Sequence, residues 1–213
     1  IKKKLNKTAY GFTMPLILDK YGNKFGKSEG NALWLDKNKT SSYELYQYLI
    51  NTDDEMVIHY LKVFTFLSKE EIEAIEKEQL QHPESRVAQK ALAREIITDL
   101  HGKEEFEKAE EMSQLLFSGN IQKLSVKDLK IGLKDVPHFD ITEEMNLVEF
   151  LVTHKIASSK REAREWITAG SISVNGEKIT DLEFVVSKQD ALEQTLTIIR
   201  RGKKKYYVGT WNE

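Results

Sequence analysis

The spacing of the apolar residues changes near residue 140 of this 213-residue chain, and this change limits the folds that the chain can adopt. Upstream of it, apolar residues such as Leu92, Ile96 and Leu100 recur every four residues, as on one face of an α-helix. Downstream, residues 171–179 alternate between apolar and polar side chains around an Asn-Gly pair, as in a β-hairpin. The sequence therefore predicts a multidomain protein in which an all-α unit precedes a small α+β unit.

Capping residues mark the starts of the predicted helices. Thr40-Ser41-Ser42 is an N-cap cluster, and Ser68 begins a capping box with Glu71. Pro83 is typical of the first turn of a helix, and Gly102 is placed to end that helix. Helices are expected after residue 42, after residue 53 or 54, after residue 68, and over 83–101, 104–117 and 125–133.

Turn residues divide the rest of the chain. Pro137 and the lack of periodicity over 134–146 indicate a linker. A β-compatible run over 10–18 predicts a strand. In the last unit, helices are expected over 147–152 and from Ser159 to Gly170, and strands over 171–174, 177–179, 196–200 and 206–208. The predicted domains are 1–39, 40–133 and 147–213, with 134–146 as the linker.

Composition excludes several classes of site. The chain has no cysteine, so it has no disulfide, no thiolate metal site and no cysteine nucleophile, and it fits a reducing cytoplasm. Its longest charge-free stretch near the start, 8–18, is too short to cross a bilayer, and a soluble protein is expected. The net charge is −2, but Lys+Arg outnumber Asp+Glu by 10 to 7 over 1–65 and by 11 to 8 over 155–213, against 11 to 18 over 66–145. A polyanion would therefore bind at the two basic ends.

The segment Lys24-Phe25-Gly26-Lys27-Ser28 contains two lysines three residues apart with a glycine between them. Glycine lets the backbone approach a triphosphate closely, and two ammonium groups neutralise the charge that grows during attack on the α-phosphate. A solvated Lys/Gly turn is the alternative. A P-loop would also need a glycine at position 21, which is tyrosine, and a helix directly after Ser28, which the sequence does not predict.

Two clusters of basic residues in the last unit are candidates for contact with a nucleic acid. Lys160, Arg161 and Arg164 can share one face of the helix that starts at Ser159. A second cluster combines phosphate-binding cations with aromatic rings suited to stacking. It consists of Arg200, Arg201, Lys203, Lys204 and Lys205, followed by Tyr206 and Tyr207. A solvated helix face and a disordered basic tail are the alternatives.

Residues 24–36, 40–48 and 64–67 resemble the KMSKS-type loop, in its KFGKS form, and the following sequence of the bacterial tyrosyl-tRNA synthetases, which are class I aminoacyl-tRNA synthetases. Residues 156–164 and 170–176 resemble the S-four-like RNA-binding fold, and the ending 200–206 is similar to that of the same synthetases.

The resemblance implies the end of an α/β Rossmann-type catalytic domain, then a helical anticodon-binding domain, then a small α+β S-four-like RNA-binding domain. It implies a tyrosine–tRNA ligase in which residues 24–28 contact ATP, accompanied by Mg, and in which Lys24 and Lys27 are catalytic. The cations at 160, 161, 164, 200, 201 and 203–205 would bind tRNA(Tyr), in a parent that is a homodimer. None of the five histidines is followed by Gly-His, so the HIGH-type motif of class I enzymes is absent. We expect a fragment that cannot form tyrosyl-adenylate alone.

A non-catalytic RNA-binding adaptor built on the S-four-like unit is the alternative function. It accounts for residues 147–213 but gives no reason for the loop at 24–28.

Overall fold

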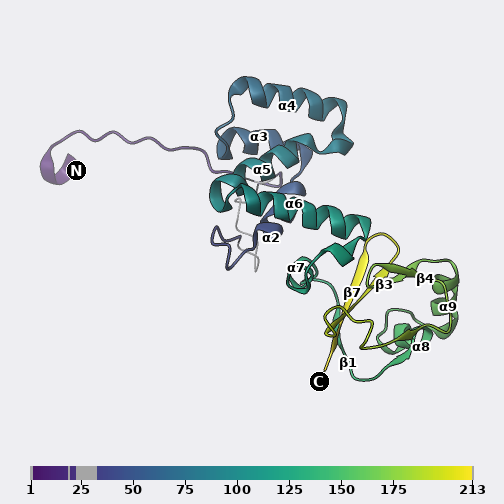
Figure 1. Ribbon diagram of the computed structural model, residues 1–213. Helices are drawn as coiled ribbons and strands as arrows, with labels where there is room; N and C mark the ends of the chain where they lie inside the picture. The colour runs from purple at the N-terminus through teal and green to yellow at the C-terminus, as the bar shows by residue number, and fades with distance from the viewer. Residues whose placement is uncertain (1, 19, 23–32, 213) are drawn as a thin grey trace.

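The computed structural model describes residues 2–18, 20–22 and 33–212 (Figure 1). Among these residues, an all-α region is followed by a small sheet with two further helices (Figure 1), as the change in apolar spacing predicts. The helices are α1 (Lys2–Leu5), α2 (Ser42–Ile50), α3 (Asp54–Phe64), α4 (Lys69–Gln81), α5 (Val87–His101), α6 (Lys103–Ser118), α7 (Val126–Gly132), α8 (Leu147–Thr153) and α9 (Lys160–Thr168), with 3₁₀ turns η1 (Pro83–Ser85) and η2 (Ile121–Lys123). The strands are β1 (His138–Ile141), β2 (Met145–Asn146), β3 (Ile172–Val174), β4 (Glu177–Ile179), β5 (Val185–Val186), β6 (Leu196–Arg201) and β7 (Lys205–Trp211).

Capping interactions fix the helix starts. The Ser68 side chain accepts from the Glu71 N–H and the Glu71 carboxylate accepts from the Ser68 N–H, which confirms that capping box. Ser41 and Glu44 form a second one at α2. The predicted helix start at Pro83 is wrong by four residues, because Pro83 opens the 3₁₀ turn η1 and Arg86, with φ +50°, separates that turn from α5.

Helices α2 to α6 share one apolar core. Leu61, Leu92 and Ile97 are fully buried in it, together with Val57 and Ala88. These side chains come from α3 and α5, and most of the polar residues of both helices face outward. Their burial at helical spacing is what allows the acidic middle of the chain to fold as a bundle.

The strand predicted over 10–18 is wrong. Residues 11–17 have no strand conformation, and the side chains of Tyr10, Phe12 and Met14 are 95%, 92% and 82% exposed. A strand needs a neighbour to satisfy its backbone N–H and C=O groups, and no named strand of the described residues pairs with this run. The β-compatible composition was therefore not sufficient.

The main sheet has the strand order β1-β7-β6-β3-β4. β1 runs parallel to β7, and the other neighbours are antiparallel. Residues 134–146 were expected to form an irregular linker, but they include β1 and β2, and β2 pairs with β5. Periodicity missed β1 because a four-residue strand is too short to show it and its partner lies about 70 residues further along the chain.

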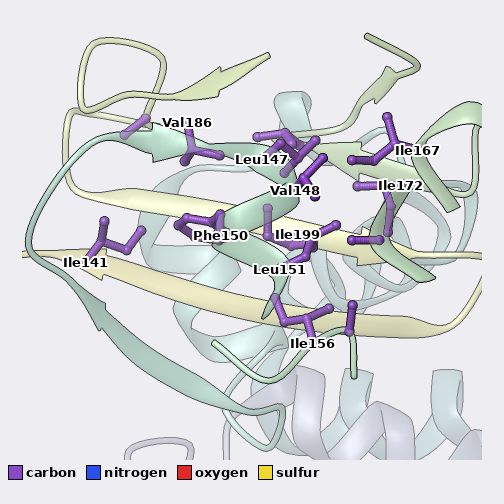
Figure 2. Close-up of a cluster of buried hydrophobic side chains, with 14 of the residues drawn as sticks. Ile141, Leu147, Val148, Phe150, Leu151, Ile156, Ile167, Ile172, Val186 and Ile199 are labelled. Atoms are coloured by element: carbon purple, nitrogen blue, oxygen red, sulfur yellow. The ribbon is translucent and has the colours of Figure 1, made fainter. Parts of the chain in front are cut away.

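Strands β6 and β7 are covered on both faces. On one face, Leu196 and Ile198 of β6 pack with Leu116 of α6 and Leu129 of α7. On the other face, Ile199 packs with residues of α8 and α9 (Figure 2). Because side chains alternate along a strand, consecutive residues of β6 point into different layers. The sheet therefore joins the helical region to the layer of α8 and α9.

The Asn175-Gly176 hairpin between β3 and β4 is confirmed. Both residues have positive φ, +50° and +89°, as a tight hairpin turn requires. Asn175 also accepts from the Ile198 N–H through its side chain and donates to the Asp190 carbonyl, at 2.8 Å and 2.7 Å. The asparagine thus holds the turn against β6.

Candidate nucleic-acid interface

The helix α9 presents three exposed cations at the surface. It starts at Ser159, whose side chain accepts from the Glu162 N–H, as the sequence predicts. Ala163 and Ile167 anchor its opposite side in the core. The cations are Lys160, Arg161 and Arg164.

Two of these cations have carboxylate partners. Lys160 Nζ lies 2.6 Å from Glu149 Oε1, and Arg161 Nε lies 3.1 Å from Glu165 Oε1. The hydrogen bond from Lys160 holds the pKa of Glu149 below its ordinary value. All four side chains are more than half exposed, so each ion pair contributes little to folding and the cations can exchange carboxylates for phosphates.

Three further exposed cations lie where β6 turns into β7: Lys203 and Lys204 are in the turn, and Lys205 is the first residue of β7. Gly202, at φ +60°, starts this turn, and its N–H donates to the Ser171 carbonyl at 2.8 Å. The Ser171 N–H donates in turn to the Trp166 carbonyl of α9, also at 2.8 Å. The structure therefore links the basic turn directly to α9.

Arg200 differs from the other cations because its guanidinium is bound within the protein. It donates to the carbonyls of Phe117 and Ser118 at the end of α6, at 3.0 Å and 3.3 Å, and to the Lys203 carbonyl at 3.0 Å. The Phe117 and Ser118 carbonyls lie in the last turn of α6, where a helix leaves its carbonyls without partners. The Tyr206 hydroxyl donates to the nearby Leu116 carbonyl at 2.5 Å. Together these bonds join the sheet to α6.

Arg201 points to the opposite side of the sheet from Arg200. Its guanidinium carbon lies 3.5 Å from the centre of the Trp166 ring. Trp166 is half-buried against the core and stacks under Arg201. Both arginines were predicted to bind RNA. Side chains alternate along a strand, and this was the signal that could have placed the two on opposite faces of β6.

The predicted ATP-contacting residues 24–28 lie outside the described residues. The described segments on either side of them are attached to the helical region. Lys20 Nζ lies 2.6 Å from Asp53 Oδ1 at the start of α3. His101 Nε2, in the last residue of α5, donates to the Leu35 carbonyl at 2.8 Å.

Over the part of the chain that the structure describes, no cluster of three or more His, Cys, Asp or Glu side chains is arranged to hold a metal ion. Within the same part, none of the helices combines the length and apolar character that a membrane crossing requires.

Two protein families match the chain. The family described as tRNA synthetases class I (W and Y) matches residues 1–118, and that described as the Tyrosine--tRNA ligase SYY-like C-terminal domain matches residues 128–208. The first match includes the segment 24–28 and most of the helical region. The second includes both basic clusters. The adaptor alternative is not favoured, because it does not account for the first match.

Similar proteins are named tyrosine–tRNA ligases or tyrosyl-tRNA synthetases. A tyrosine–tRNA ligase of Bacillus pumilus (strain SAFR-032) is 52% identical over 205 residues, which are 95% of this chain and 49% of that protein. One of Streptococcus pneumoniae (strain CGSP14) is 51% identical over 213 residues, 99% of this chain and 51% of that protein. A solution structure of a tyrosyl-tRNA synthetase C-terminal domain is 44% identical and covers 45% of this chain and 98% of its own, with a TM-score of 0.39. The chain spans about half the length of the curated relatives it matches. It belongs to the class I tRNA synthetases (W and Y) and corresponds to the C-terminal part of a bacterial tyrosyl-tRNA synthetase.

Proposed function

We propose that this chain is the part of a tyrosine–tRNA ligase that supplies an ATP-contacting loop and binds tRNA(Tyr). The whole protein activates tyrosine with ATP, accompanied by Mg²⁺, and transfers it to the tRNA in the cytoplasm. It is a homodimer through residues outside this chain. The match of residues 1–118 to a class I synthetase family carries the proposal, since it includes both lysines of the 24–28 segment.

The proposed domains follow the family. Residues 1–39 belong to a Rossmann-type catalytic domain, 40–133 form the anticodon-binding domain and 147–213 form the S-four-like domain. The pairing of β1 with β7 supports including residues 138–141 in the last unit as well.

In the proposed reaction, Lys24 and Lys27 stabilise the charge that develops on the α-phosphate and the leaving pyrophosphate when the tyrosine carboxylate attacks. Phe25, Gly26 and Ser28 complete the loop around ATP.

The activation step is tested by ATP–pyrophosphate exchange in the whole protein carrying Lys27→Ala. We expect exchange to fall by about 100-fold or more, as for the loss of one donor to a developing negative charge. Lys62→Ala, at an exposed lysine of α3, is the matched control and should exchange at the parent rate. An unchanged rate in Lys27→Ala would show that this lysine does not contact the triphosphate.

The RNA contacts are tested by replacing Lys160, Arg161 and Arg164 together by glutamine. The fold should persist, because these side chains are exposed and their ion pairs are weak. We expect weaker binding of tRNA(Tyr), with the slope of log K against log salt reduced by about two to three. The slope is measured by titrating labelled tRNA at several salt concentrations. Equal slopes in the variant and the parent would show that the cations of α9 do not contact the RNA phosphates. Lys203, Lys204 and Lys205 contribute in the same way, whereas for Arg200 we propose a structural role between the sheet and α6.

A further inference from the structure

A cavity of about 510 Å³ opens between the turn from α8 to α9 and the end of β6. Apolar residues of α8 and of the turn form one part of its wall, and Lys155, Ser158, Glu162, Trp166 and Arg201 form the polar part. Its volume lies in the range of pockets that hold small ligands or single ligand groups. The cavity adjoins the cations of α9 but is not part of their exposed face.

The stacked pair of Arg201 and Trp166 is the chemical feature of this cavity. Trp166 covers one face of the guanidinium at 3.5 Å, so a ligand can meet only the other face and the N–H edge. Unlike that of Arg200, the guanidinium of Arg201 donates no hydrogen bond to another described residue. A planar cation already stacked on an indole is suited to stack on a further flat π-system.

The other polar groups decide which part of a nucleic acid fits. The Glu162 carboxylate accepts from the N–H and the hydroxyl of Ser158, both at 2.7 Å, and this bonding holds it at the cavity wall as an anion. A carboxylate disfavours a phosphate inside the cavity, whereas it does not repel a neutral base. Lys155 is exposed at the rim, where a phosphate can reach it.

We propose that this cavity receives one unstacked base of a single-stranded region of RNA, which stacks on Arg201 over Trp166 while its phosphate lies beside Lys155. The proposal rests on the proposed function, in which this unit binds tRNA. A paired base cannot enter, because it stays within its helical stack, whereas bases of loops and bulges can be splayed out onto arginine and aromatic side chains.

The test uses the full 213-residue chain, a transcript of tRNA(Tyr), a short oligoadenylate and a fully paired RNA duplex. Binding is measured by titration, and Trp166 reports on the site because a base stacked on Arg201 changes the surroundings of the indole beneath that guanidinium and so changes its fluorescence, which we expect to see as quenching. We expect quenching by the transcript and by oligoadenylate but not by the duplex. Trp166→Phe should retain most of the affinity and lose the quenching. Trp166→Ala and Arg201→Lys should each weaken transcript binding by about tenfold.

Arg161→Gln, on the same helix but away from this cavity, is the matched charge variant. It should lower the salt dependence and leave the quenching intact. Circular dichroism checks the folding of each variant, and Arg201→Lys keeps the test valid if Trp166→Ala does not fold.

The outcomes separate the two proposals. Tight transcript binding that neither Trp166→Ala nor Arg201→Lys changes would overturn the base site and leave the proposed function in place. Equal quenching by the duplex and the transcript would show that the cavity contacts a helix backbone rather than an unstacked base, and would overturn the proposal. If the parent chain binds neither the transcript nor oligoadenylate, both the base site and the proposed function are overturned.

Discussion

The ring of His154 packs against two phenylalanine rings, with centroid distances of 4.1 Å to Phe139 and 4.5 Å to Phe150. Its Nε2 atom is buried and has no hydrogen-bond partner among the described residues. Burial lowers the pKa of this imidazole below its ordinary value of 6.5. Below that pH the unfolded chain therefore binds a proton more readily than the folded one.

We predict from this residue that the free energy of unfolding decreases as the pH falls below about 6.5. His154→Gln should flatten the dependence between about pH 7 and pH 5.5, a window that lies above the ordinary range of the carboxyl groups. Urea denaturation at a series of pH values measures this pH dependence of the free energy of unfolding. An undiminished slope in His154→Gln would contradict the assignment.

At the scale of elements, two glycine turns of the sheet differ in what surrounds them. A Cβ at Gly176, between β3 and β4, would lie 3.2 Å from Ile121 Cγ1 and 3.3 Å from the Gly119 carbonyl oxygen. A Cβ at Gly202, between β6 and β7, would meet no atom within 4 Å. Both have positive φ, so alanine is strained at both.

Gly202→Ala should therefore cost about 1–2 kcal/mol of stability through backbone strain alone. Gly176→Ala should cost more, because it also pushes the β3–β4 hairpin away from η2. Thermal unfolding of the two variants measures the difference. Equal losses would show that the hairpin does not press on the helical region.

The same elements show what the sequence could predict. Most helix starts follow from side chains three residues apart, such as Ser68 with Glu71, and the β3–β4 hairpin follows from Asn175-Gly176. Both signals are local. A strand also needs a partner, which local sequence does not reveal. The run at 10–18 pairs with no named strand among the described residues and was predicted wrongly, whereas β1 pairs with a strand about 70 residues away and was missed. The Arg201–Trp166 pair could not be predicted, because it requires knowing which helix covers which face of β6.

At the scale of the whole molecule, the helical region and the sheet share buried side chains. Leu116, Ile121 and Leu129 pack directly against β6 and β7, and Arg200 and Tyr206 satisfy carbonyls at the end of α6. The two regions are therefore expected to stabilise each other rather than to unfold separately.

Far-UV circular dichroism, which is dominated by the helices, and tryptophan fluorescence, to which Trp166 and Trp211 of the last unit contribute, should report coincident thermal transitions. Two separate midpoints would show that the shared core is too weak to couple the regions. Arg200→Gln should lower both midpoints together.

Because β6 and β7 are covered on both faces, the proposed RNA ligand would meet these two strands at their rim, where Lys203 and Lys204 of the turn and Lys205 at the start of β7 are exposed. Residues of that turn can gain or lose charge without disturbing any buried layer. Under the proposed function, the strength of RNA binding can therefore change under selection while stability stays constant, so that related proteins could adapt to different salt or RNA concentrations through these residues alone.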